Sequence, residues 1–383
     1  MGRIIFYVIF SSILNLLSLY IFIRGLQSLP SNSIVKYTYA VVFWIIALSF
    51  MAGQLLENVL PPSIAHFFIW IGSFWIAAML YFLIAVVSLD LIRLVNHFLP
   101  FFPAFLKDHY SKAKYVTSAV TVGFVCLLLL GGYVNSVIPR IKKLNLTVAK
   151  KASGMKSLNI VAVTDIHLGV IVGRSRVDSI VNKINSLNPD LVLLPGDIVD
   201  SDLAPVIRQN IGDALKNLKS RYGIFGATGN HEHIGGVEKA CAYLTEHNIV
   251  MLRDQSVKIG NSFYIMGRED FSAGRFDGGS RKPLSALMAA VDKKYPVILM
   301  DHQPFGLEEA AKQGADLQIS GHTHYGQLWP LNYIVKSVYE LPWGYKKIGD
   351  TYYYVSSGVG TWGPPVRIGN HPEILQIRLN FKE

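Results

Sequence analysis

The sequence predicts an α/β layered domain preceded by a helical transmembrane region. Three observations predict this arrangement. Long apolar runs dominate the chain before residue 140, and short apolar runs alternate with helix-like segments after residue 156. In addition, oxygen and imidazole donors follow several of the short apolar runs. We therefore expect a membrane region at residues 1–139, a basic linker at 140–156 and a folded domain at 157–383.

The apolar runs of the first region are long enough to cross a bilayer. They cover residues 4–23, 39–56, 64–89 and 115–138, each near or above the roughly 20 residues that a transmembrane helix needs. The second run is the weakest, because it is the shortest and contains Gln54. A cleaved signal peptide is a weaker interpretation of the first run, which is long for such a segment and lacks a clear cleavage site. About four transmembrane helices are expected.

Charge separates the two halves of the chain. Residues 1–154 hold 12 Lys or Arg and 3 acidic residues, a net charge of +9, whereas the remainder holds 24 and 23, a net charge of +1. Because the basic excess belongs to the membrane half, anionic lipid headgroups are its natural partner. Nucleic acid is not expected as a partner, because the folded domain lacks the basic surplus that binds phosphate backbones.

The orientation of the folded domain is a tie by the positive-inside rule. The loops after the first and third runs carry six Lys or Arg, and the opposite side also carries six. Long domains translocate with little regard to charge, so the short loops count more and place the folded domain outside the cytoplasm. Cysteine does not decide the compartment, because Cys241 is alone in the domain and no disulfide can form within it.

Residues 157–383 alternate between strand-like and helix-like segments. The apolar runs at 159–163, 191–194 and 297–300 are typical of buried strands. Further strand candidates are residues 224–227, 249–252, 263–266, 317–320, 352–355 and 374–379. Helix candidates are residues 176–187, 205–219, 237–247 and 284–293. This alternation indicates an α/β layered fold.

Five short segments of the folded domain carry side chains of the kind that bind metals. They contain Asp165, His167, Asp197, Asn230, His231, Glu232, Asp301, His302, His322 and His324. One such pair alone is more often solvated than metal-bound, but the five segments together indicate a two-metal hydrolase site. Two divalent ions about 4 Å apart can activate water and clamp the attacking and leaving oxygens of a phosphoryl centre. Mixed imidazole and oxygen donors suit Mn, Fe or Zn better than Ca.

The order of these segments resembles the calcineurin-like metallophosphoesterase superfamily, whose pattern is D-x-H, G-D, G-N-H-[DE], H and G-H-x-H. The resemblance covers roughly residues 155–383 and implies a two-sheet sandwich flanked by helices. The last stretch, with Gly358-Val359-Gly360-Thr361 and Pro364-Pro365-Val366-Arg367, is most similar to the membrane-associated bacterial branch of that family.

The same resemblance implies a role for each donor. Asp197 would bridge two divalent metal ions. Asp165, His167 and His324 would complete one metal site, and Asn230, His302 and His322 the other. The catalytic residue would be His231, which is no ligand and is placed to protonate the leaving oxygen or stabilise the transition state. Many family members carry an Arg soon after the G-D segment, where this chain has Ser201-Asp202, so its contacts with phosphate are expected to differ.

Three further acidic residues have simpler interpretations. Glu232 is expected to cap a helix or to support a ligand. Asp200 and Asp202 are most simply helix-starting residues before Leu203-Ala204.

An aromatic stretch after His324 bears on the substrate. Residues 328–347 contain two tryptophans, three tyrosines and the adjacent Lys346 and Lys347. This stretch is either an amphipathic cap that dips into the membrane interface or a loop with an aromatic mini-core. A cap would favour a lipid-linked substrate.

These observations lead to one functional hypothesis and two alternatives. We expect a membrane-anchored, dinuclear metal-dependent phosphoesterase that hydrolyses a phosphoester or pyrophosphate, lipid-linked or related to the cell envelope, in the bacterial inner (cytoplasmic) membrane. A catalytically silent sensor would use the same metal pocket to bind a lipid phosphate. A transport module fused to a phosphatase is disfavoured, because the apolar runs contain almost no charged residues.

Overall fold

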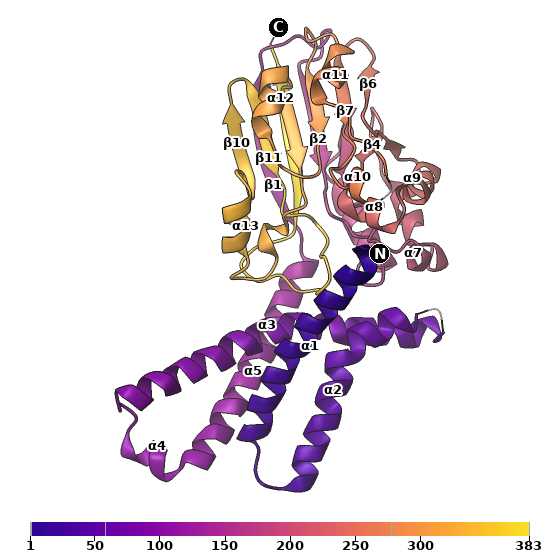
Figure 1. Cartoon of the computed structure of the whole chain (residues 1–383). Coiled ribbons are helices and arrows are strands. Elements are labelled where there is room, and N and C mark those ends of the chain that lie inside the picture. The colour runs from indigo at the N-terminus through magenta and orange to yellow at the C-terminus, as the bar shows by residue number, and fades with distance from the viewer. Residues whose placement is uncertain (1, 58, 277, 383) are drawn as a thin grey trace. The chain divides into compact units, whose positions relative to one another are not determined.

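The computed structural model describes residues 2–57, 59–276 and 278–382, with the side chains of residues 2–8 and 10 outside the description (Figure 1). The chain divides into two compact units. The helical unit comprises residues 1–133 and 363–366. The other unit comprises residues 134–362 and 367–383 and is called the catalytic unit, after the hydrolase site that the sequence predicts in it. Each unit is described by itself below.

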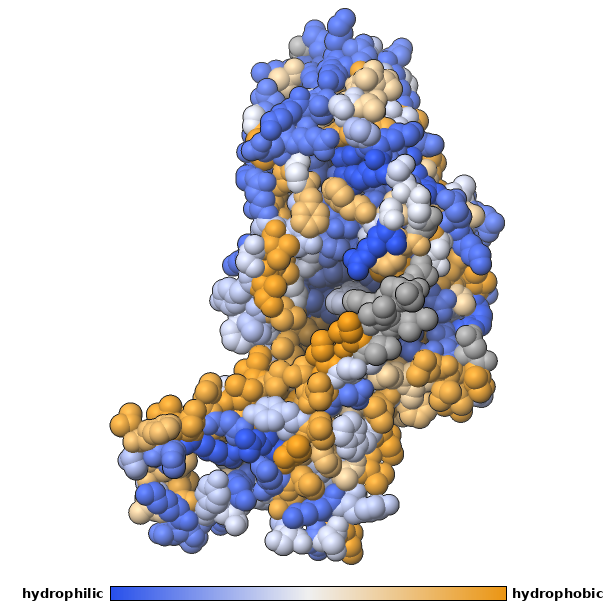
Figure 2. All heavy atoms as spheres, viewed as in Figure 1, coloured by the Kyte–Doolittle hydropathy of each residue, from blue (hydrophilic) through white to orange (hydrophobic). Residues whose placement is uncertain are grey.

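The N-terminal elements are helices. They are α1 (Gly2–Ser28), α2 (Ser33–Leu55), α3 (Pro62–Phe98), the short α4 (Ala104–Asp108) and α5 (Tyr110–Val137). Three of them, α2, α3 and α5, are long and apolar enough to cross a membrane. The expected first span coincides with α1, whose first side chains lie outside the described residues. Large apolar side chains such as Val120 and Leu127 point outward from α5, and much of the helical unit has an apolar surface (Figure 2).

The catalytic unit contains two six-stranded mixed sheets (Figure 1). The first has the order β1 (Arg140–Val148), β12 (Glu373–Phe381), β2 (Ser157–Ala162), β3 (Leu191–Pro195), β4 (Ile224–Ala227) and β5 (Val250–Met251). The second has the order β10 (Gly344–Ile348), β11 (Thr351–Val355), β9 (Leu317–Ser320), β8 (Val297–Met300), β7 (Phe263–Gly267) and β6 (Gln255–Ile259).

The two sheets pack against each other and are covered by helices on their outer faces. Side chains of both sheets, such as Ile160 and Ile298, share one buried cluster. The apolar face of α6 (Arg174–Asn185) packs on the outer face of the first sheet. The helices α11 (Leu284–Ala289) and α12 (Leu307–Gln313) pack on the outer face of the second. The two-sheet sandwich flanked by helices is confirmed.

Strand direction brings one end of each sheet to the site. β2, β3 and β4 are parallel, as are β8 and β9, so their carboxyl ends and the loops that follow lie at a common edge. β12 runs antiparallel to β2, and β1 runs parallel to β12. β1 therefore begins at the same end of the sheet at which β2 terminates.

Two expectations from the sequence were wrong in detail. Residues 140–148 of the expected basic linker form β1, an edge strand whose basic side chains point to solvent while Leu146 and Val148 are buried. Charged residues on an edge strand are a common protection against aggregation, and here they disguised the strand. The expected helix at 205–219 is α7 (Ala204–Arg208) followed by a 3-10 helix, η1 (Ile211–Asn217), because Asn210 between them adopts a left-handed conformation with φ of 49°.

Candidate metal centre

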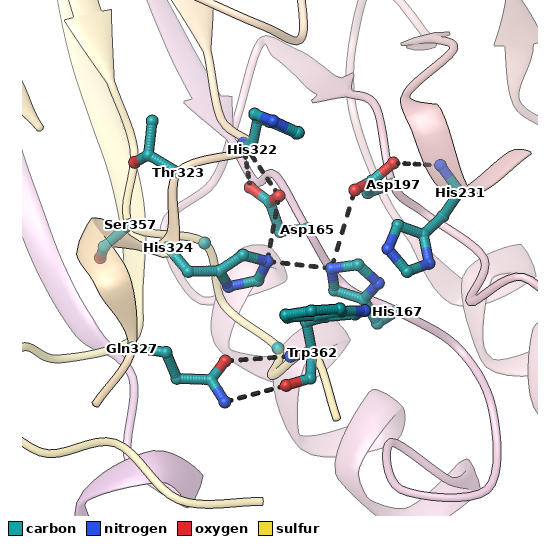
Figure 3. Close-up of polar contacts among 12 residues, drawn as sticks. Asp165, His167, Asp197, His231, His322, Thr323, His324, Gln327, Ser357 and Trp362 are labelled. Carbon is teal, nitrogen blue, oxygen red and sulfur yellow. Dashed lines mark hydrogen bonds and ion pairs between the residues drawn. The ribbon is translucent and has the colours of Figure 1, made fainter. Parts of the chain in front are cut away.

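Each metal-binding side chain stands on a loop that follows a strand at the common edge. Asp165 and His167 follow β2, and Asp197 follows β3. Asn230 and His231 begin α8 (Asn230–Gly235) after β4, His302 follows β8, and His322 and His324 follow β9. All are buried except Asn230 and His322, which are half-buried. Folding thus collects donors from both sheets (Figure 3).

Two groups of donors can each hold a cation. Asp165, His167 and His324 place their ligand atoms within 4.8 Å of one another, as do Asp197, His302 and His322. In the first group, His167 Nε2 lies 3.0 Å from His324 Nε2, and His324 Nε2 lies 3.4 Å from Asp165 Oδ1 (Figure 3). Ligand atoms around one cation with bonds near 2.1 Å are typically about 3 to 3.5 Å apart, so these separations fit a shared metal ion.

Asp197 stands between the two groups. Its Oδ2 atom lies 3.1 Å from His302 Nε2 in one group and 3.8 Å from His167 Nε2 in the other. In the second group, Asn230 Oδ1 also lies 2.7 Å from His322 Nδ1. A carboxylate in this position can serve both groups.

The contacts of His302 place its second ring nitrogen where a cation can bind. Its Nδ1 atom donates a hydrogen bond to the Pro195 carbonyl at 2.9 Å, and its Nε2 atom faces the Asp197 carboxylate at 3.1 Å. Nε2 has no hydrogen-bond partner among the described residues. Burial lowers the pKa of His302, but the charge of Asp197 outweighs burial and raises that pKa well above its usual range. Without metal, Nε2 therefore holds a proton opposite the Asp197 carboxylate, and a cation can take the place of that proton, so the donors fit a metal ion.

The backbone of the donor loops is unusual. Five donors have positive φ between 44° and 69°. They are Asp165, His167, Asp197, His322 and His324. Non-glycine residues rarely adopt this conformation, and such strain concentrates at functional sites. The glycines of the motifs provide space, since a Cβ at Gly229 would collide with the Asp197 carboxylate and one at Gly321 with that of Asp165.

Comparison with known proteins identifies the family. The family described as calcineurin-like phosphoesterase matches residues 158–326. A metallophosphoesterase of Helicobacter pylori is 31% identical over 365 residues, covering 93% of this chain and 93% of the relative. The chain belongs to the metallophosphoesterase family. A Bos taurus relative of this metallophosphoesterase, named transmembrane protein with metallophosphoesterase domain, is 32% identical over 68% of this chain and 62% of its own length.

Family membership settles the general activity. This metallophosphoesterase is a metal-dependent phosphoester hydrolase, and its family uses two divalent cations. The resemblance inferred from the motifs is confirmed. Its restriction to a bacterial branch is too narrow, because relatives from Bos taurus and Danio rerio share about a third of the aligned residues.

His231 of the metallophosphoesterase lies beside the donors with its own hydrogen-bond partners. Its Nδ1 atom lies 2.8 Å from Asp200 Oδ1 and 3.0 Å from Ser201 Oγ. Its backbone N–H donates to Asp197 Oδ1 at 2.9 Å (Figure 3). Burial lowers the pKa of His231, but the charge of Asp197 and the hydrogen bond with Asp200 raise it to about 9. The imidazole therefore carries a proton at neutral pH in the absence of metal.

The expectation for Asp200 was wrong. Asp200 starts no helix. The next helix, α7, begins at Ala204, and the Ala204 N–H donates a hydrogen bond to Asp202 Oδ1. Asp200 instead forms a third group with His167 and His231, in which the carboxylate orients the imidazole of His231. Its position three residues after Asp197, in a loop that leaves a buried strand, was the signal that sequence reasoning missed.

Glu232 supports the donors from behind. Its Oε2 atom accepts hydrogen bonds from the N–H groups of Asp197 at 3.0 Å and Gly229 at 2.7 Å. Its Oε1 atom accepts from Val199 N–H at 2.9 Å. Glu232 therefore caps α8 and ties the loop after β3 to the loop after β4, as expected from the sequence.

A buried arginine contacts the first group. The guanidinium of Arg367 is fully buried and lies 3.2 Å from His324 Nδ1. It also donates to the carbonyls of Ser357 at 2.7 Å and Gly360 at 2.7 Å. Burial lowers the pKa of Arg367 to about 9, so the residue is still charged at neutral pH. The arginine missing after the G-D segment is thus not replaced by Arg367, which holds a ligand loop in place.

The aromatic stretch is more exposed than a mini-core. Residues 332–338 form α13 (Asn332–Val338), a helix with no buried residue, and residues 344–348 form β10. Trp329 is 47% exposed and Tyr333 is 61% exposed. Trp343 packs on Tyr325 with ring centroids 5.3 Å apart. The stretch therefore contains an exposed helix followed by an edge strand.

Proposed function

We propose that Asp197 bridges two divalent cations in this protein. Asp165, His167 and His324 would hold one cation, and Asn230, His302 and His322 the other. The observation that carries this assignment is the position of the Asp197 carboxylate, 3.1 Å from His302 Nε2 and 3.8 Å from His167 Nε2. Burial lowers the pKa of His167 to about 3 and that of His322 to about 4, so both imidazoles are neutral and ready to bind metal.

The cations and the residues around them would have separate roles in hydrolysis. Two divalent cations would polarise the phosphoester and stabilise charge on its oxygens. His231 would donate a proton to the leaving oxygen, and Asp200 would hold its imidazole in the required orientation. Glu232 would hold the loop after β3 and the loop after β4 in fixed positions relative to each other.

The membrane part of the proposal concerns residues 1–139. We propose that they anchor the enzyme with about four transmembrane helices, supported by the three long apolar helices and by the Bos taurus relative named a transmembrane protein. The location would be the bacterial inner membrane, with the catalytic unit outside the cytoplasm. A lipid-linked or cell-envelope phosphoester or pyrophosphate would be the substrate, and manganese is the first metal to test.

No observation favours the alternative of a silent lipid-phosphate sensor. All seven donors and His231 are present and gathered in one place among the described residues. Hydrolysis is therefore the function that we propose.

Hydrolysis of chromogenic substrates tests this function. The full chain, purified in detergent, should cleave a phosphodiester or the matching monoester with Mn²⁺, lose activity with EDTA and regain it when Mn²⁺ returns. The Asp197→Asn variant should lose both activity and bound metal, measured by elemental analysis. Asp178→Asn on the exposed face of α6 is the matched control and should retain both. Full activity of the Asp197→Asn variant would contradict the proposal that Asp197 bridges the two cations.

A further inference from the structure

Strand direction places the entry of the chain and the metal donors at one end of the catalytic unit. Two residues separate the end of α5 from β1, which begins at Arg140, and Arg140 pairs with Glu373 at the beginning of β12. β12 is antiparallel to β2, with Leu375 opposite Ala162 at the end of β2. Asp165 lies three residues after Ala162. The segment that leaves α5 therefore joins the catalytic unit at the end that carries the donors.

This junction is firmly bonded. The last turn of α5 belongs to the catalytic unit. Asn135 Nδ2 donates to the carbonyl oxygens of Arg367 at 2.9 Å and Asn370 at 2.7 Å. Arg176 donates to the Ser136 carbonyl at 2.6 Å. Residues 134–137 are thus bonded to other parts of the catalytic unit.

The same end carries exposed apolar side chains. The aromatic rim, as we name it, consists of Trp329, Tyr333, Ile334, Val338 and Trp362, which are 47%, 61%, 61%, 56% and 55% exposed. Four of them belong to α13 and the residues before it, where apolar side chains gather on an otherwise largely hydrophilic catalytic unit (Figure 2). A surface of this kind normally has a partner.

Hydrogen bonds hold the rim together and next to the donors. The backbone N–H of Trp362 donates to Gln327 Oε1 at 3.0 Å, and Gln327 Nε2 donates back to the Trp362 carbonyl at 2.9 Å (Figure 3). Trp329 N–H donates to the Ile368 carbonyl at 2.8 Å. The Trp362 ring lies 6.3 Å from the ring of His231. Trp362, one member of the rim, therefore lies beside His231.

Charges on this end of the unit favour an anionic surface. Lys336 on α13 lies over the rings of Tyr325 and Tyr333 at 5.7 and 5.6 Å. The side chains at the beginning of β1, Arg140, Lys142 and Lys143, point to solvent. The exposed acid of the stretch, Glu340, is paired with Lys346 at 2.6 Å. Tryptophan and tyrosine beside lysine and arginine are typical of surfaces that sit at the lipid headgroup level.

We propose that the aromatic rim binds the anionic headgroup region of the lipid bilayer in which the enzyme is anchored. The phosphoester would then reach the metal donors laterally from the bilayer surface, past Trp362. This proposal rests on the proposed membrane anchor and names the partner of the same site.

Position-specific quenching in nanodiscs of anionic phospholipid tests the rim. The full chain carrying Cys126→Ala, with Cys241 buried, receives one new cysteine labelled with an environment-sensitive dye. Ile334→Cys reports on the rim. Lys294→Cys is the control, because it is exposed before the amino end of β8, opposite the donors. Val120→Cys, 65% exposed on α5, reports on the anchor.

The three positions separate failure of the rim from failure of the anchor. Lipids with a spin label near the headgroup should quench the dye at 334 and leave that at 294 unchanged, while chain-labelled lipids should quench the dye at 120. Quenching at 120 without quenching at 334 would contradict lipid binding by the aromatic rim and support the membrane anchor. No quenching at 120 would contradict the membrane anchor, and with it the proposal that the aromatic rim binds lipid. A dye at 334 that is shielded from aqueous iodide but not quenched by lipid would assign the rim to a protein partner, which also overturns the proposal.

Discussion

Replacing Arg367 by methionine should destabilise the catalytic unit and loosen a metal ligand. The guanidinium is fully buried, and its hydrogen bonds to Ser357 and Gly360 hold the loop before β12. It also contacts His324 Nδ1 at 3.2 Å. Methionine has a similar length but no donor, so these partners would lose the group that fixes them.

The size of the effect follows from the carbonyls left behind. A buried acceptor without a partner costs about 1 to 3 kcal/mol, and two carbonyls, those of Ser357 and Gly360, would lose this donor. Removing a buried cation also removes its desolvation cost, which offsets part of the loss. A net destabilisation of about 3 kcal/mol is expected. For a unit of this size it lowers the unfolding midpoint by about 6 to 12 °C.

Thermal unfolding followed by tryptophan fluorescence measures this change in detergent-purified protein. Arg378→Met on β12 is the matched control, because its side chain is exposed and its loss should change the midpoint little. Elemental analysis of the same samples should show less bound metal for Arg367→Met than for the control. Equal midpoints and equal metal contents in the two variants would refute the reasoning.

Two more predictions test the site and the junction. His231→Gln should lose turnover and keep its metals, since His231 contacts the donors without belonging to either group; a metal-free variant would move His231 into the ligand set. A chain that begins at Arg140 should melt about 10 to 20 °C below one that begins at Val134, because it lacks the five hydrogen bonds that Asn135, Ser136 and Pro139 make with the catalytic unit, worth about 1 kcal/mol each. Equal thermal unfolding midpoints of the two shortened chains would show that these hydrogen bonds do not stabilise the catalytic unit.

Hydrophobic pattern was enough to predict most of the core strands. β4 and β9 have the expected bounds, and β3 and β8 differ from theirs by at most one residue, because continuous apolar runs flanked by polar loops are hard to mistake. β1 was missed because the first half of this edge strand is basic and exposed, and only its second half contains buried apolar residues. β10 was missed because it begins with glycine and contains two adjacent lysines, a composition shared with surface loops.

Motif order located the donors, but only the fold shows how they meet. The seven donors lie at intervals over about 160 residues, and the parallel strands of two sheets bring them within contact distance. Asp200 and Arg367 were not assigned to the site, because neither belongs to a recognisable donor segment. Their roles depend on backbone loops that place a carboxylate beside His231 and a guanidinium beside His324. Local sequence does not encode such distant pairings.

The left-handed backbone of the donors has a consequence for the life of the protein in a cell. Five residues in this conformation cost about 1 kcal/mol each, so together they cost about 5 kcal/mol, comparable to the whole stability of a small domain. Cations bound to these side chains would offset that cost. A molecule without its cations is therefore the more easily unfolded and degraded form. Metal supply would then govern how much of the protein persists, a relation that its abundance across a gradient of metal in the growth medium would reveal.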